Sequence, residues 1–187
     1  RGSAAGLKAT PEVRAVAIGR ALGGALVATA TDVVTPRGDR IAVGPGIVAL
    51  HETAAGIVVG YRDGHLELVG GDVAFEDTPH AQPTALATGP GDTIVVGYSD
   101  GSVGMWPSRG GPRLAAARLH GAVVHVAVAG TQMHLASDLG RHLTWHLEAF
   151  HQDACAVLRD VWRDVPVVWE GGRPVARATP AEHRCHP

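Results

Sequence analysis

The chain has 187 residues, 45% of them hydrophobic, and a formal net charge of −2 from 16 basic and 18 acidic side chains. This length and composition are typical of a soluble globular protein and argue against disorder over most of the chain. The sequence has no long block of one charge and no apolar run of roughly 18 residues, so it predicts neither nucleic-acid binding nor a membrane span.

The first predicted elements, before residue 46, show the weakest pattern. The stretch "ALVATATDVVTPRGDRIAV" from Ala25 to Val43 alternates short apolar runs with turn residues, which predicts a degenerate set of strands. The glycine-rich "GRALGG" from Gly19 to Gly24 fits neither the dinucleotide-binding nor the Walker pattern, so a loop is expected there.

An internal repeat occupies the middle of the chain. "IVVGYRDGHLELV" at 57–69 and "IVVGYSDGSVGMW" at 94–106 agree at seven of thirteen positions and lie 37 residues apart. A weaker copy, "MHLASDLGRHLTW" at 133–145, follows 39 residues later and keeps Gly140 and Trp145, while Asp138 falls one place early. Such a constant spacing indicates a repeat architecture.

Each copy predicts a β-hairpin, because an apolar run and an alternating run flank an Asp-Gly turn, at Asp63-Gly64 and Asp100-Gly101. Further apolar segments begin at Gly46, Pro83 and Ala122 and predict an inner strand before each hairpin. "DVAFED" at 72–77 and "RLAAARLHG" at 113–121 predict a fourth strand after the first two hairpins. Four antiparallel strands in about forty residues are the period of a β-propeller blade.

At this point the sequence resembles the WD40 family. "LHGAVVHVAVAGTQMHLASDLGRHLTW" has a His-Gly before the inner strand, an aspartate in the turn and a tryptophan ending the third strand. The Trp-Asp pair of the family is replaced by Trp106-Pro107 and Trp145-His146, which argues against its complete His, Ser/Thr, Asp and Trp network. The resemblance implies an all-β fold of about four WD40-like propeller blades over residues 1–147. The structural repeat positions are Asp63, Gly64, His80, Asp100, Gly101, Trp106, His120, Asp138, Gly140 and Trp145.

The residues from Gly97 to Gly101 spell G-x-S-x-G, the nucleophile elbow of serine hydrolases, with Ser99 at its centre. An elbow needs a helix after the serine, whereas "SVGMW" reads as a strand, and the sister copy has Arg62 at this position. We therefore interpret Ser99 as a solvent-facing turn residue and keep a hydrolase with a catalytic Ser99 as a disfavoured alternative.

Residues 148–187 change character and form a second predicted domain. Apolar residues recur at helical spacing from Glu148 to Val165, which predicts one amphipathic helix ending before Pro166. A second hairpin is expected around Gly171 and Gly172. The apolar face of the helix is formed by Phe150, Ala154, Leu158, Val161, Trp162 and Val165.

Histidines and cysteines gather in the last third of the chain, and imidazole with thiolate is the ligand set that zinc prefers. His142 and His146 share a face of a predicted strand, but too far apart for easy shared coordination. We therefore read these histidines as solvated or hydrogen-bonded. The alternative is a metal site or an enzyme built on this region, with Cys155, His183, Cys185 and His186 as ligands.

Taken together, the sequence favours a non-catalytic interaction or sensing scaffold, with no catalytic residue and no cofactor. Its expected partner is a protein, either another chain or a missing segment that completes the propeller. Lys8 is the only lysine, which indicates a GC-rich bacterial source, and a regulatory part of a larger effector such as a protease or NTPase is a further possibility. Two cysteines are too few for a disulfide scaffold and fit a reducing compartment, so the cytoplasm is expected, with one bridge between them left open as an alternative.

Overall fold

The computed structural model describes residues 12–19, 21–176 and 182–185, and the chain divides into two compact units, Arg1–His146 and Leu147–Pro187. The prediction of an all-β fold is confirmed in coarse form, since the described chain consists mainly of strands in several antiparallel sheets. The second unit contributes two helices and a hairpin. The two units are described separately below.

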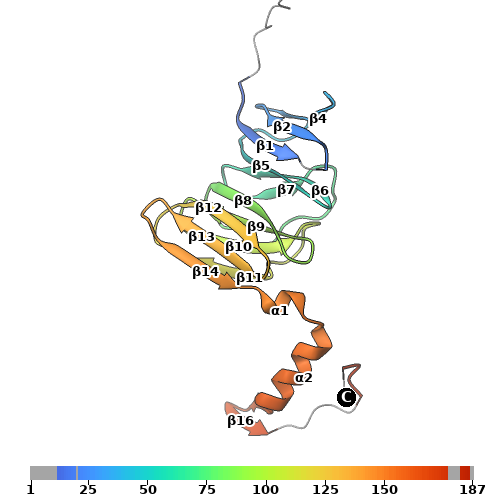
Figure 1. Ribbon diagram of the computed structural model, residues 1–187, viewed down its shortest axis with the longest axis vertical. Helices are drawn as coiled ribbons and strands as arrows, with labels where there is room; N and C mark the ends of the chain where they lie inside the picture. The colour runs from blue at the N-terminus through green and yellow to red at the C-terminus, as the bar shows by residue number, and fades with distance from the viewer. Residues whose placement is uncertain (1–11, 20, 177–181, 186–187) are drawn as a thin grey trace, which may run out of the picture. The chain divides into compact units, whose positions relative to one another are not determined.

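Four antiparallel sheets follow one another in the first unit (Figure 1). The first contains β1 (Ala15–Gly19), β2 (Gly24–Ala28), β3 (Asp32–Val34) and β4 (Arg40–Ala42), and the second β5 (Ile47–Thr53), β6 (Gly56–Tyr61) and β7 (Leu66–Leu68). The third contains β8 (Pro83–Gly89), β9 (Thr93–Tyr98), β10 (Ser102–Pro107) and β11 (Ala115–Arg118), and the fourth β12 (Val123–Ala129), β13 (Gln132–Ser137) and β14 (His142–His146).

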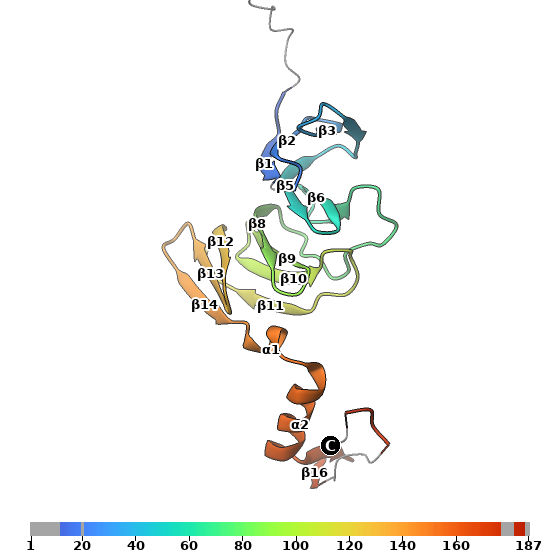
Figure 2. The same ribbon diagram turned by 45° about the vertical axis from the view of Figure 1, so that its right-hand side comes forward.

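The first strand of each sheet packs on the first strand of the next, in the order β1, β5, β8, β12. Figure 2 shows β5 between β1 and β8. Within the described residues, β12 and β1 do not form an interface comparable to those between consecutive sheets. The series therefore has two ends, each with one sheet face that no further sheet of this unit covers.

The three repeated hairpins share one set of backbone hydrogen bonds. The turn residues Arg62, Ser99 and Asp138 donate their N–H groups to carbonyls at the start of the inner strands, each at 2.9 Å. The turn glycines that follow have positive φ, 102° at Gly64 and 86° at Gly101. Asp63 and Asp100 thus occupy equivalent turns, as the sequence repeat predicts. A glycine follows each of them because only glycine adopts this backbone conformation without strain.

Alternating side chains of β6 and β9 build two separate cores. Ile57, Val59 and Tyr61 of β6 pack toward the first sheet, in a cluster with Leu26 and Val33. Ile94, Val96 and Tyr98 of β9 pack toward the second sheet, in a cluster with Val58 and Leu66. The period of two residues along a strand thus lets each central sheet serve two interfaces.

The expected fourth strand at 72–77 is wrong, because this segment forms only one isolated bridge, Phe75 to Gly111. Phe75 is nevertheless buried in the cluster of the second and third sheets, with 6% of its surface exposed. The segment is therefore held by one aromatic anchor and by two backbone hydrogen bonds, between Gly111 and the Phe75 neighbours Ala74 and Glu76, instead of by a longer ladder.

The single helix expected over 148–165 is two helices, α1 (Glu148–His151) and α2 (Ala154–Asp164). Gln152 is extended, and the Asp153 side chain accepts a hydrogen bond from the Ala156 N–H at 2.9 Å. Aspartate at this position starts a new helix because it satisfies a free N–H of the first turn. The expected hairpin is present as β15 (Val167–Glu170) and β16 (Arg173–Ala176).

Cys155 at the start of α2 and Cys185 in the tail are joined by a disulfide across 30 residues of sequence. The sequence left one bridge between these two cysteines open, and the structure contains it. Of the described helices, none has the length and apolar character needed to cross a membrane.

Candidate functional site

A hollow of about 990 Å³ lies where the first strands of the four sheets approach one another. Its walls are mostly alkyl groups and backbone, with threonine hydroxyls between them. The lining comes from β1, β5, β8 and β12 and includes Val16, Ile18, Leu50, Leu86, Thr88 and Val128. Polar and apolar atoms contribute similar shares of this surface, so the hollow is not a purely apolar site.

Two titratable side chains line this hollow, His51 and Glu52, and both already have structural partners. His51 Nε2 lies 3.0 Å from the Thr88 hydroxyl, and burial lowers the pKa of His51. The Glu52 carboxylate accepts hydrogen bonds from the N–H groups of Ala21 and Leu22, at 3.0 and 3.1 Å. His51 and Glu52 therefore fix loops and strands in place. They do not form a nucleophile–base pair.

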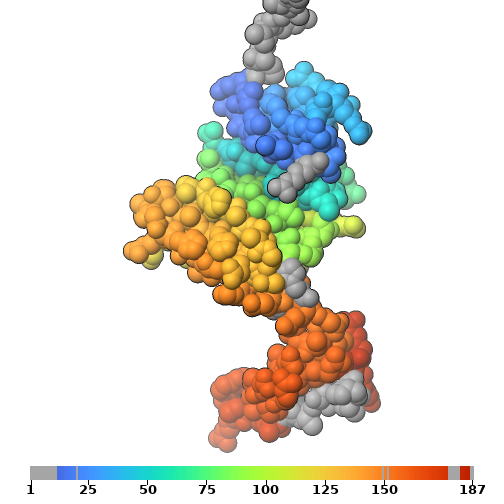
Figure 3. Space-filling model, viewed as in Figure 1, coloured from blue at the N-terminus to red at the C-terminus, as the bar shows by residue number. Residues whose placement is uncertain are grey.

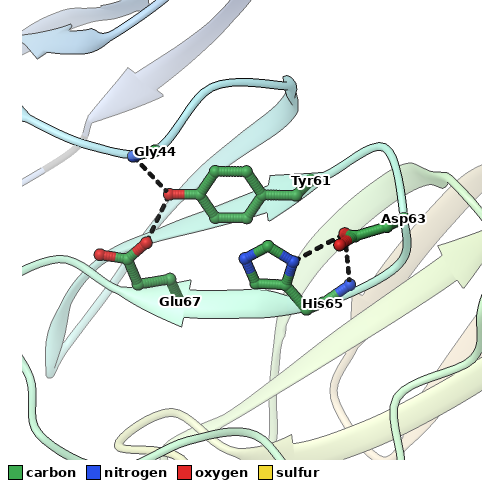
Figure 4. A network of polar contacts seen from close by, with 5 residues as sticks. All are labelled: Gly44, Tyr61, Asp63, His65 and Glu67. Atoms are coloured by element: carbon green, nitrogen blue, oxygen red, sulfur yellow. Dashed lines mark hydrogen bonds and ion pairs between the residues drawn. The ribbon is translucent and has the colours of Figure 1, made fainter.

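A connected network of polar contacts surrounds Tyr61, at the end of β6 (Figure 4). The Tyr61 hydroxyl donates to Glu67 and accepts from the Gly44 N–H at 3.2 Å. The His65 ring stacks on Tyr61, with ring centroids 4.0 Å apart, and its Nδ1 lies 2.6 Å from Asp63 Oδ1. Burial, followed by the Glu67 contact, raises the pKa of Tyr61 to about 12. Every group here has a partner within the network, which ties the turn to the second sheet.

The equivalent tyrosine of the third sheet, Tyr98, has a different environment. Its side chain is fully buried, and its hydroxyl has no hydrogen-bond partner. The position that Glu67 occupies in the second sheet is Gly104 here, and a Cβ atom at Gly104 would lie 2.2 Å from the Trp106 ring. Trp106 thus takes the space of the missing carboxylate and donates its Nε1–H to the Glu76 carbonyl at 2.7 Å.

Ser99 lies exposed in the turn between β9 and β10, and its N–H donates to the Gln82 carbonyl at 2.9 Å. A strand follows it at Ser102, so the strand-turn-helix geometry of a nucleophile elbow is absent at this position. Its place in the structure is that of Arg62 in the second sheet.

The WD40 positions are partly brought together. Asp100 accepts from the N–H and hydroxyl of Ser102 at 2.9 and 2.8 Å, and Trp106 is fully buried. His80 and His120 are exposed. In the described residues, neither histidine forms a hydrogen bond that links an aspartate to a tryptophan.

The alternative ligand set is not assembled in the described residues. Cys155 and Cys185 are consumed in their disulfide, so neither offers a thiolate. The His183 ring packs edge-on against Trp162 at 5.1 Å, and His186 lies outside the described residues. No group of three or more His, Cys, Asp or Glu side chains within the described ranges is arranged to hold a metal ion.

No protein-family model matches the chain, and no curated protein matches it either. Solved structures do resemble it. The computationally designed Ika4 protein has 18% identity and a TM-score of 0.59, over 75% of this chain and 94% of that chain. The likeness is one of fold alone.

Two further structures are about as similar but longer. The computationally designed Ika8 protein has 19% identity and a TM-score of 0.58, over 72% of this chain and 46% of that one. A chain of the Mitotic Checkpoint Complex has 16% identity and a TM-score of 0.58, over 73% and 50%. The present chain thus spans about half the length of each of these two proteins.

Proposed function

We propose that the chain is a non-catalytic interaction scaffold whose first unit is a series of four WD40-like β-propeller blades. The observation that carries this proposal is the stacking of β1, β5, β8 and β12 around one hollow, with a roughly forty-residue repeat behind it. Repeated sheets of this kind present extended surfaces to partners without any catalytic group.

The chemistry of the polar side chains supports a scaffold over an enzyme. His51, Glu52, Tyr61 and Glu67 are all used to fix turns and strands. A hydrolase would need a nucleophile within hydrogen-bond distance of a base, and Ser99 is exposed in a turn without such a contact among the described residues.

The partner we propose is a protein that covers a free sheet face at an end of the series. Val16 and Ile18 of β1 are 61% and 81% exposed, whereas Leu50 and Val126, which occupy the position of Val16 in β5 and β12, are 6% and 9% exposed. Two similar structures are about twice as long as the matched region, which supports the idea that four sheets are part of a larger arrangement.

Activity-based probes test the scaffold proposal directly. Purified protein is incubated with a fluorophosphonate probe and with ester substrates, and its metal content is measured by elemental analysis. We expect no labelling, no turnover and no stoichiometric zinc. Labelling that Ser99→Ala abolishes would overturn the proposal in favour of a hydrolase.

A further inference from the structure

The side chains of the second strand of each sheet determine how consecutive sheets pack on each other. In β6 and β9, one set of alternate residues faces the preceding sheet, and the other set faces the following sheet. Val58 and Val95 belong to the second set and are fully buried, as is Leu26 of β2. An apolar side chain at this position is therefore common to the first three sheets.

The free face of the first sheet continues the apolar pattern. When the first two sheets are aligned by the hydrogen bonds of their hairpin turns, Ala25 and Val27 correspond to Ile57 and Val59. These two residues of β6 are buried against a preceding sheet. Val16 pairs with Val27, and Val27 pairs with Val34, so three valines form one row across this face. Ile18 and Ala25 form the next row. We name Val16, Ile18, Ala25, Val27 and Val34 the open face.

The charged groups beside the open face are paired with each other. Arg40 and Asp32 on this side of β3 and β4 form an ion pair at 3.4 Å. Arg14, just before β1, pairs with Glu12 at 2.9 Å. These two ion pairs leave no net charge on the four described side chains involved.

The free face of the fourth sheet breaks the pattern. The positions of Val95, Val103 and Met105 in the third sheet are taken here by His134, His142 and Thr144. His125 lies in the same row as His142, on either side of Ala136, and the rings of His134 and His142 stack with centroids 5.8 Å apart. Polar side chains at the end of a repeat series keep that end in water. We name His125, His134, Ala136, His142 and Thr144 the histidine face.

We propose that the open face binds the open face of a second copy of this chain, related by a two-fold axis. This inference rests on the proposed scaffold function and names its partner. The pattern of the open face is continuous with three sheet-to-sheet interfaces that already exist in the molecule. Its complement must be an apolar sheet face, and a second copy supplies one.

The difference between the two ends fixes the mode of association. Head-to-tail contacts would place the open face on the histidine face and bury three imidazoles. Among the described residues only His134 has a hydrogen-bond partner there, the Thr144 hydroxyl at 3.3 Å, so this burial is unfavourable. Contact between two open faces buries apolar surface on both sides and leaves both histidine faces in water. A two-fold contact uses the same patch on each copy, so association ends at the dimer.

Sedimentation velocity on the full chain tests this inference with a matched pair of variants. Ile18→Glu puts a charge on the open face, and Thr144→Glu puts the same charge on the histidine face. We expect a dimer for the wild type and for Thr144→Glu, and a dissociation constant at least about tenfold higher for Ile18→Glu. Ile18 is exposed and Thr144 is only partly buried, so we expect both variants to fold. Circular dichroism verifies their folding.

Two results would overturn the inference. One is a wild-type chain that remains a monomer at about 100 µM. The other is a dimer that Thr144→Glu dissociates and Ile18→Glu does not. Either result leaves the scaffold proposal standing, because that proposal depends on the probe and metal assays. Conversely, fluorophosphonate labelling of a normal dimer would reject the scaffold proposal alone.

Discussion

At the level of single residues, Tyr61 and Tyr98 occupy the same repeat position but differ in their hydroxyl contacts. Tyr61 makes two hydrogen bonds, to Glu67 and Gly44, whereas the buried Tyr98 hydroxyl makes none. A buried polar group without a partner costs free energy, and a satisfied one contributes about 1 kcal/mol per bond. The repeat therefore offers a natural pair for measuring what a tyrosine hydroxyl contributes.

We expect Tyr61→Phe to lower the free energy of unfolding by about 1–2 kcal/mol, because two hydrogen bonds are lost. Tyr98→Phe is expected to leave it unchanged or to raise it by up to about 1 kcal/mol, because only an unpaired hydroxyl is removed. Urea titration of both variants provides the measurement. Equal losses in the two variants would contradict the difference in environment.

Both tyrosines also predict a loss of stability at alkaline pH. Burial raises the pKa of Tyr98, and that of Tyr61 is raised to about 12. In the unfolded chain both hydroxyls ionise near pH 10, while the folded chain retains their protons. The stabilising effect is therefore complete below about pH 10 and is lost as the pH rises through the folded-state values.

The chain has two tyrosines, so tyrosinate absorbance at alkaline pH reports these two groups. We expect the titration of folded protein to lie above that of the denatured chain, and the urea midpoint to fall from about pH 10 upward. Tyr98→Phe should make this fall shallower. A midpoint independent of pH between about 9 and 11 would contradict the prediction.

At the level of secondary-structure elements, the hairpin turns differ in how tightly they are enclosed. Gly101 has φ of 86°, and a Cβ atom there would lie 2.1 Å from the Leu119 carbonyl oxygen. Gly140 has φ of 72°, but no atom lies within 4 Å of such a Cβ. One turn thus requires glycine for its backbone angle and for space, and the other for its angle alone.

We expect Gly140→Ala to destabilise the protein by about 1 kcal/mol through backbone strain. Gly101→Ala should cost at least about 1 kcal/mol more, because the backbone of the following segment must also move. Thermal unfolding of the two variants compares them directly. A smaller loss for Gly101→Ala than for Gly140→Ala would argue against the packing of this turn.

The disulfide is the main covalent constraint of the second unit. We expect isolated protein, denatured without reductant, to have no thiol that reacts with iodoacetamide, and two after reduction. Replacing both Cys155 and Cys185 by serine should destabilise the second unit by about 3 kcal/mol, because the bridge closes a long loop. Free thiols in protein purified under oxidising conditions would contradict the pairing.

Much of the first unit could be predicted from the sequence, because the repeat marks each Asp-Gly turn and the strands beside it. The replacement of a strand at 72–77 by a single bridge at Phe75 could not be predicted, since the apolar residues of this segment are typical of any edge strand. Asp153 interrupts a helical pattern of apolar residues through one capping hydrogen bond, which periodicity does not detect. The histidine face was missed because His125, His134 and His142 meet only through strand register.

At the level of the whole molecule, the two units differ in how much of their backbone is enclosed. Every residue of β6 but the first and every residue of β9 is buried, whereas α2 contains no buried residue. Figure 3 shows the sheets of the first unit packed against one another from blue to orange. Local opening is cheapest where few apolar contacts are lost.

We expect amide hydrogen exchange to be slowest in β6 and β9 and fastest in α2 and the β15–β16 hairpin. Exchange followed by mass spectrometry on the full chain resolves these segments after digestion. Reduction of the disulfide should accelerate exchange in α2 and leave β9 unchanged. Protection in α2 equal to that in β9 would show that the second unit is as stable as the first.

The bridge between Cys155 and Cys185 also gives the chain a covalent ring. A protease that cuts once inside this ring leaves a single molecule, which separates into two pieces only in the presence of reductant. When the chain is pulled by its two ends, force passes through the sulfur atoms and bypasses the residues between the two cysteines, which lie 30 positions apart. The fully extended oxidised chain is therefore shorter than the reduced one by about 100 Å, at about 3.3–3.6 Å per residue.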